Sequence, residues 1–380
     1  MLNTFSFSIN LMSEFDFLFK DTLKKIPFQP NMALAFISAS LKIPTIMDAF
    51  SEAGISLIGC TTAGEILFDK EKDIISEKGA VFILMEISKK NFSIGIIESL
   101  SSDFKTGRAV GELVRNSFPN SSAFIFSSGI HRDGTALTKG INDTLDNKTP
   151  VYGAMAGDDL RFKKSFVFTE QKISEDGIAY IAFNSDKISM KGMSVCGWQG
   201  IGAGFNITKT DGNYIYEINN KPALDFIIEY LNISENDLPL SSLEYSFMIK
   251  DDAIPKTYRI ITGFNKEKKY LIVSGGIKEG QKVSFSVSSG FDILSKTREK
   301  TMKFYENHHT ADLLFLFSSV SRNISLGPLV VTEIKLAPLK WKAPLIGMFS
   351  YGELGTKGEN EKPVFYNQSF TLVTIKEINP

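Results

Sequence analysis

Residues 58–66 read I-G-C-T-T-A-G-E-I, and two later segments of the chain repeat the pattern of this stretch. They are Y-G-A-M-A-G-D-D-L at residues 152–160 and I-G-M-F-S-Y-G-E-L at residues 346–354. In each of these three glycine phrases an apolar residue precedes a glycine, and a second glycine four or five residues later is followed by Glu or Asp. The repetition indicates that one building block has been copied along the chain.

An apolar run that ends in serine lies upstream of each glycine phrase. The runs are A-F-I-S-A-S at residues 35–40, F-I-F-S-S at 124–128 and F-L-F-S-S at 315–319. An apolar run, a helical segment and a second apolar run in this order are typical of a β-α-β unit. We therefore expect two parallel strands in each unit, with serines at the end of the first and a glycine phrase at the end of the second.

The length of the chain predicts two domains, because 380 residues exceed what one hydrophobic core usually supports. Strands and helices alternate in some parts of the sequence and separate in others, which predicts mixed sheets. The expected fold class is α/β to α+β, with mixed β-sheets flanked by helices and built from repeated β-α-β units. We place the boundary near Val195, giving domains at residues 1–195 and 196–380.

Composition limits the partners and the compartment. The 42 Lys and Arg nearly balance the 43 Asp and Glu, so we expect no nucleic-acid partner. Two cysteines fit a reducing cytoplasm. The first residues do not read as a signal peptide, and no apolar run approaches the ~20 residues needed to cross a bilayer. A cytoplasmic protein without membrane insertion is expected.

Metal and nucleotide motifs are not recognisable in the sequence. Only three histidines are available, without a C-x-x-C or H-E-x-x-H arrangement. The glycine-dense stretch at residues 197–204 lacks the Lys-Ser/Thr of a P-loop and does not fit G-x-G-x-x-G. We therefore expect neither a metal nor another cofactor.

The repeated polar residues predict a binding site. The carboxyl ends of parallel strands open on one edge of a sheet, where α/β proteins bind ligands. Short donors and acceptors would come from Cys60, Thr61, Thr62, Ser127, Ser128, Ser318 and Ser319. Arg132 and Arg322 could each hold a carboxylate in a two-point fork. Glu65, Asp158, Asp159 and Glu353 could bind an ammonium group. Together these groups suit a zwitterion such as an amino acid.

Two other interpretations remain open for the same residues. Glycines after strands often form turns, and serines at strand ends often cap the next helix, so the phrases could be purely structural. Cys60 could instead be a nucleophile if His131 lies beside it, although a lone cysteine is more often a small buried residue. The sequence leaves a sensor, a scaffold and an enzyme as alternatives.

The phrases and their flanks resemble a known family. I-G-C-T-T-A-G-E-I and V-Y-G-A-M-A-G-D-D-L-R-F (residues 151–162) resemble the N-terminal half of the FIST domain. The linked C-terminal half is similar to segments at residues 197–204, 207–224, 314–322 and 344–355. The family's motif positions map onto Cys60–Glu65, Gly153–Asp159, Arg322 and Gly352–Glu353. Two departures are Ser318-Ser319, where many relatives have a cysteine, and the large side chain of Phe349.

This resemblance implies an intracellular sensory module of signal transduction that binds small ligands such as amino acids. In bacteria such modules occur alone or fused to histidine-kinase, chemotaxis or cyclic-dinucleotide modules, so a separate protein of these kinds is the expected partner. We expect a non-catalytic sensor that relays its occupancy to that output protein. The expected ligand-binding residues are Cys60, Thr61, Thr62, Gly64, Glu65, Ser127, Ser128, Arg132, Gly157, Asp158, Asp159, Arg322, Tyr351, Gly352 and Glu353.

Overall fold

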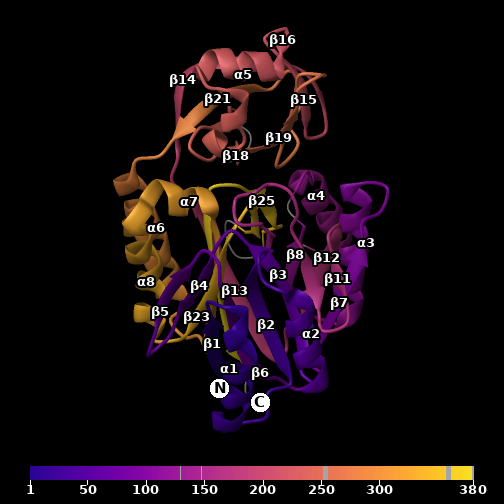
Figure 1. The fold of residues 1–380 in the computed structure, drawn as a ribbon, viewed down its shortest axis with the longest axis vertical. Helices are drawn as coiled ribbons and strands as arrows, with labels where there is room; N and C mark the ends of the chain where they lie inside the picture. Colours follow the sequence, from indigo (N-terminus) through magenta and orange to yellow (C-terminus); the bar gives the residue numbers. More distant parts are fainter. Residues whose placement is uncertain (129, 147, 251–255, 357–360, 379–380) are drawn as a thin grey trace.

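The computed structural model describes residues 1–128, 130–146, 148–250, 256–356 and 361–378. It shows a large body that contains both ends of the described chain and a smaller lobe on top of it (Figure 1). The described helices, with mixed sheets in the body and antiparallel pairing in the lobe, confirm the expected fold class.

The body consists of three units with the same order of elements. Each has a six-stranded sheet with one parallel pair at its centre: β2–β3, β8–β9 or β22–β23. The first unit supplies β1(Asn3–Ile9), β2(Met32–Ser38), β3(Ser56–Thr62) and β6(Ala80–Glu86). The second supplies β7(Phe92–Glu98), β8(Ser121–Ser127), β9(Val151–Met155) and β12(Gly177–Asn184). The third supplies β13(Ile188–Cys196), β22(Leu313–Ser319), β23(Leu345–Ser350) and β26(Ser369–Glu377).

Each unit also gives a hairpin to a neighbouring unit. The hairpins are β4(Glu65–Phe68)–β5(Asp73–Ser76), β10(Val167–Thr169)–β11(Ile173–Ser174) and β24(Gly352–Gly355)–β25(Val364–Tyr366). β4 pairs with β23 of the third unit, β10 with β3 of the first, and β24 with β9 of the second. The exchange is cyclic, so the three sheets surround a common pseudo-threefold axis.

Helices cover the outer faces of the sheets (Figure 1). They are α1(Phe15–Lys25) and α2(Ile43–Glu52) in the first unit, α3(Asp103–Ser117) and α4(Gly134–Thr144) in the second, and α6(Gly290–Asn307), α7(Val320–Leu326) and α8(Val330–Trp341) in the third. The inner faces share one core, because side chains alternate between the two faces along a strand.

Three equivalent phenylalanines meet in this inner core. Phe36, Phe126 and Phe317 are fully buried, and their ring centroids lie 5.7, 6.1 and 5.8 Å apart in edge-to-face arrangements. Such arrangements are the ones that aromatic rings prefer. The ends of β2, β8 and β22 are therefore held at one place on the axis.

The lobe is inserted into the third unit, between β13 and α6. It contains β14(Gln199–Asp211), β15(Tyr214–Ile218), β16(Lys221–Pro222), α5(Ala223–Leu231), β17(Ser246–Lys250), β18(Thr257–Arg259), β19(Ile261–Asn265), β20(Tyr270–Val273) and β21(Lys282–Val287). The division at residues 195 and 196 stays a prediction. In the body, β13 pairs with β26 and β9 with β24, so two of the sheets contain strands from both sides of that point.

Candidate functional site

The three glycine phrases meet at one junction on the axis. Thr61 donates its hydroxyl to the carbonyl of Gly157 at 2.7 Å, and the amide of Asp159 donates to the carbonyl of Thr62 at 3.0 Å. The third phrase joins both others, because Ala63 N donates to Phe349 O at 2.9 Å and Tyr351 N to Met155 O at 3.2 Å. The structure thus brings together residues that are almost 300 positions apart in sequence.

Serines lie at the inner ends of the first strands of the three units. Ser38, Ser128 and Ser319 each follow a phenylalanine of the inner trio by two residues and are buried. The period of two along a strand places them at the polar end of the same core. Ser38 donates to Asp159 at 3.0 Å and Ser128 accepts from Arg132 at 3.1 Å. The hydroxyl of Ser319 is buried without a partner among the described residues.

Glu65 and Glu353 occupy equivalent positions and are fully buried. The carboxyl of Glu65 contacts the Thr62 hydroxyl at 2.5 Å and the amide of Gly79 at 2.9 Å. Glu353 contacts the hydroxyls of Ser350 and Ser369 at 2.7 and 2.8 Å. Burial raises the pKa of each carboxyl to about 8. Each acid thus links the start of an exchanged hairpin to the start of its unit's last strand. Gly79 directly precedes β6, and Ser369 is the first residue of β26.

The acid of the second phrase has a different role. Asp158 is buried and accepts hydrogen bonds from the backbone amides of Phe162, Lys163 and Lys164 at 2.9, 2.6 and 2.9 Å. Its carboxylate also accepts from the Tyr351 hydroxyl at 2.6 Å. The Tyr351 ring is stacked on Phe162 at 4.6 Å. Asp158 therefore shapes the loop that follows the phrase, and its oxygens are used within the protein.

Asp159 points the other way, toward the first unit. Its backbone has φ of 57°, and Leu160 and Phe162 have φ of 63° and 51°. Bulky residues rarely adopt this left-handed region, and such conformations concentrate at functional sites. The Asp159 side chain is 6% exposed, with Oδ2 bonded to Ser38 and to Arg161 at 3.3 Å. Its Oδ1 is buried and has no hydrogen-bond partner among the described residues.

Burial of this carboxyl raises the pKa of Asp159. The cause is the loss of water around the charged form, which a nearby cation would offset. Arg161 lies largely in solvent, with 51% of its side chain exposed, so its charge is screened. Asp159 is thus a buried acid at the junction of the first two phrases, with one carboxylate oxygen that has no partner among the described residues.

Arg132 and Arg322 both have protein partners. Arg132 contacts Asp103 at 2.6 Å and Asp176 at 2.7 Å. Arg322 is fully buried, forms an ion pair with the equally buried Glu333, and donates to the carbonyl of Gln368 at 3.0 Å. In both units the guanidinium bonds to the residue that directly precedes the last strand, Asp176 before β12 and Gln368 before β26. The carboxylate-binding role expected of these arginines stays a prediction, and in this structure their forks are filled by the protein's own acids.

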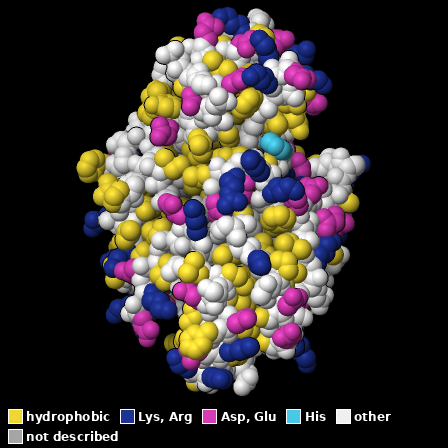
Figure 2. Space-filling view, viewed as in Figure 1, with side chains coloured by type: hydrophobic (Ala, Val, Ile, Leu, Met, Phe, Trp, Pro, Cys, Tyr) yellow, Lys and Arg dark blue, Asp and Glu magenta, His cyan; other side chains and the backbone are white. Residues whose placement is uncertain are grey.

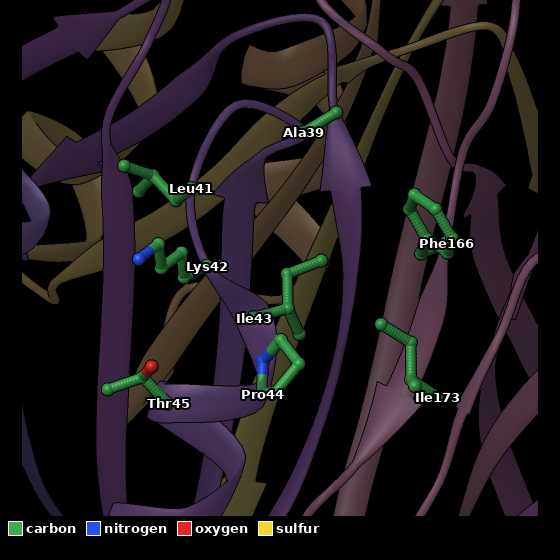
Figure 3. Close-up of a pocket in the computed structure, with 8 residues that line it drawn as sticks. All are labelled: Ala39, Leu41, Lys42, Ile43, Pro44, Thr45, Phe166 and Ile173. Atoms are coloured by element: carbon green, nitrogen blue, oxygen red, sulfur yellow. The ribbon is translucent and has the colours of Figure 1, made fainter.

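A pocket of about 390 Å³ opens at the end of β2. It is lined by Ala39, Leu41, Lys42, Ile43, Pro44, Thr45, Phe166 and Ile173. Figure 3 shows Phe166 and Ile173 facing Ile43 and Pro44, with Ala39 at the tip of β2. Ala39 directly follows Ser38, whose hydroxyl donates to Asp159 Oδ2. The pocket therefore lies beside the residue that bonds to the Asp159 carboxylate.

The remaining predicted residues have structural contacts at the junction. Cys60 is fully buried with its sulfur 3.5 Å from that of Met348, and burial raises the pKa of its thiol. Ser127 donates to the carbonyl of Ser128 at 3.2 Å. A Cβ added at Gly64 would lie 2.9 Å from Phe349 and one at Gly352 would lie 2.6 Å from Phe365, so neither position has room for a side chain. These two glycines let the phrases pack closely.

Sequence reasoning missed Ser38 and the lining of the pocket. Ser38 lies at the same point of its apolar run as Ser128 and Ser319, and this alignment was the signal that could have found it. Nothing comparable marks Phe166 or Ile173, since they come to the first unit on the exchanged hairpin. Among the described residues no group of three or more His, Cys, Asp and Glu could hold a metal ion.

Comparison with known families now identifies this architecture. Residues 31–221 match the FIST N domain and residues 223–356 match the FIST C domain. The chain belongs to the FIST family. FIST domains are associated with sensory functions in signal transduction. A search of proteins with curated descriptions gave no match.

The junction combines both FIST domains. The FIST N domain supplies the first two phrases, Ser38, Asp159 and every residue of the pocket, while the FIST C domain supplies Arg322, Tyr351 and Glu353. In the part of the chain that the structure describes, no helix is long and apolar enough to span a membrane. One face of the molecule shows Lys and Arg interspersed with Asp and Glu (Figure 2).

Proposed function

We propose that this FIST protein is a cytoplasmic sensor that binds a small polar ligand of the amino-acid type. The ligand's ammonium group would bind Asp159 Oδ1, and the hydroxyls at the ends of the first strands would complete the polar contacts. The observation that supports this proposal most directly is the buried carboxylate oxygen of Asp159, which lacks a hydrogen-bond partner among the described residues. An unpaired buried polar atom costs about 1–3 kcal/mol, so a cation that pairs with it gains correspondingly.

The surroundings of Asp159 support a binding site over a purely structural loop. Its neighbour Asp158 holds the loop through three backbone amides, whereas Asp159 accepts a side-chain bond from Ser38 and leaves one oxygen free. The loop also holds Leu160 and Phe162 in left-handed conformations, at a cost of order 1–3 kcal/mol each. A scaffold alone gives no reason for this cost.

We propose binding rather than catalysis. The reactive form of a cysteine is the thiolate, and burial of Cys60 in the inner core favours the thiol. The chemistry expected of a Cys60 enzyme needs an accessible sulfur, whereas Cys60 is packed against Met348. This placement supports the sensor over the enzyme.

The contacts of Asn367 suggest how occupancy could be relayed. Asn367 donates to the carbonyl of Tyr351 at 2.9 Å and accepts from Ser274 of the lobe at 2.6 Å. Tyr351 in turn bonds to Asp158, the neighbour of the proposed ammonium contact. We propose that a ligand shifts the lobe through this chain of contacts. A separate output protein of the histidine-kinase, chemotaxis or cyclic-dinucleotide type would read the shift.

A thermal-shift screen of the amino acids tests the proposal. A ligand at a hundred times its Kd adds about 2.7 kcal/mol, which raises Tm by a few degrees. Asp159→Asn removes the charge and should abolish the shift. Asp186→Asn is the matched control, because Asp186 is an exposed acid that bonds to Asn120 at 2.9 Å. A shift that persists in Asp159→Asn, or the lack of any shift in the wild type at millimolar concentration, would refute the proposal.

A further inference from the structure

We infer that the ligand carries an apolar side chain, which lies in the pocket at the start of α2. This inference rests on the proposed function, because it places the ammonium group on Asp159. The pocket volume of about 390 Å³ falls within the range of small-ligand sites. Six of its lining residues have aliphatic or aromatic side chains with no polar atom, namely Ala39, Leu41, Ile43, Pro44, Phe166 and Ile173. A branched aliphatic or aromatic side chain suits this lining.

Comparison of the units supports the choice of this place. In the second unit the corresponding space is filled by Phe365 of the exchanged hairpin, whose ring lies against Gly134 at the start of α4. The ring is 2% exposed and would overlap any side chain added at Gly134. In the first unit the hairpin residues Phe166 and Ile173 line the pocket and do not fill it. Among the described residues, Asp159 is the one Asp or Glu with a buried carboxylate oxygen that lacks a hydrogen-bond partner.

The start of α2 suits the ligand's carboxylate. The first turns of α3 and α4 are capped by the side chains of Ser102 and Asp133. At α2 the N-cap residue is Lys42, whose side chain makes no capping hydrogen bond. Ile43 N already bonds to Leu41 O and Pro44 has no N–H, so an anion here would use the amides of Thr45 and Ile46. The positive end of the helix dipole and the Lys42 ammonium favour an anion at this end. Lys42 lines the same pocket as the apolar side chains.

The three contacts together define a ligand class. An ammonium group on Asp159, a carboxylate at the start of α2 and an apolar group against Phe166 describe an amino acid such as leucine or phenylalanine. Ala39 connects the first two contacts, because it lines the pocket and directly follows Ser38, which donates to Asp159.

The test measures Kd by titration calorimetry of the full chain with L-leucine, L-phenylalanine, L-serine and L-aspartate. Loss of apolar burial is worth about tenfold or more in affinity, so leucine and phenylalanine should bind at least about tenfold more tightly than serine. Leu41→Ser should weaken leucine binding by about tenfold, and Ala39→Leu should block it by filling the pocket. Leu100→Ser is the control, because Leu100 lies outside the pocket and is 53% exposed.

Two further probes separate the contacts. 3-Methylbutylamine lacks the carboxylate and should bind more weakly than leucine but still require Asp159. 4-Methylpentanoate lacks the ammonium group and should bind equally to the wild type and to Asp159→Asn. If serine and aspartate bind as well as leucine and Leu41→Ser changes nothing, the side-chain inference is overturned while the proposed function stands. If no amino acid binds, the proposed function fails and the inference fails with it.

Discussion

Replacement of Glu353 by glutamine tests whether this buried acid is neutral in the folded protein. The Ser350 hydroxyl lies 3.3 Å from the carbonyl of Ser318 and 2.7 Å from Glu353 Oε1. A hydroxyl has one proton, so if Ser350 donates to the carbonyl, Glu353 must donate to Ser350. A protonated carboxyl does this, and so does the amide of Glu353→Gln, whose oxygen can still accept from the Ser369 amide.

The sign and size of the effect follow from the raised pKa. The Glu353 carboxyl loses its proton near pH 4.5 when unfolded and at about 8 when folded. Between these values the folded state binds more protons, so the free energy of unfolding falls as pH rises. The contribution is full below about pH 4.5 and lost above about pH 8. At about 1.36 kcal/mol per pH unit over about 3.5 units, it amounts to at most about 5 kcal/mol.

Urea unfolding at pH 5 to 8.5, followed by the fluorescence of the buried Trp198 and Trp341, measures this slope. Wild type should lose several kcal/mol across the range, and Glu353→Gln should remove about half of the loss because Glu65 supplies a similar share. The variant should match wild type at pH 5 and exceed it at pH 8.5. Glu86→Gln, at an exposed position, should leave the slope unchanged. Parallel profiles for wild type and Glu353→Gln would show that the acid is not neutral.

Two further substitutions test the body of the fold. Phe317→Ala removes one ring of the inner trio and should cost about 3–5 kcal/mol in urea unfolding, whereas Phe17→Ala, at a side chain 72% exposed, should cost little. Equal losses in the free energy of unfolding for Phe317→Ala and Phe17→Ala would contradict the packing of the three rings. Arg322→Ala leaves Glu333 buried without its partner and should also cost about 3–5 kcal/mol, whereas Arg108→Ala, at a pair about half exposed, should cost under about 1 kcal/mol. A small loss for Arg322→Ala would show that the pair is not buried.

The repeated unit could be predicted from the sequence because its signals are local. Apolar runs mark β2, β8 and β22, and a glycine phrase follows the second strand of each unit. The same local signals predicted that serines and acids gather at the strand ends. The structure places Thr61, Gly157 and Tyr351 at one junction, as that reasoning requires.

The hairpin exchange could not be predicted from the sequence. β4 pairs with β23 across about 280 residues, through backbone groups that every residue carries. The separate roles of Asp158 and Asp159 were also hidden, since adjacent acids look alike in sequence. Their difference arises from the left-handed backbone at Asp159, which turns its side chain toward Ser38. The pocket was missed because Phe166 and Ile173 reach it only through the exchanged hairpin.

The central claim is that Asp159 binds the ammonium group of an amino acid, and one titration tests it most directly. L-leucine is titrated at pH 7 into wild type and into Asp159→Asn, with unfolding measured in parallel to show that both are folded. We expect saturable binding to wild type and at least a tenfold weaker Kd for the variant, which corresponds to about 1.4 kcal/mol. Equal affinity for the two proteins would contradict it.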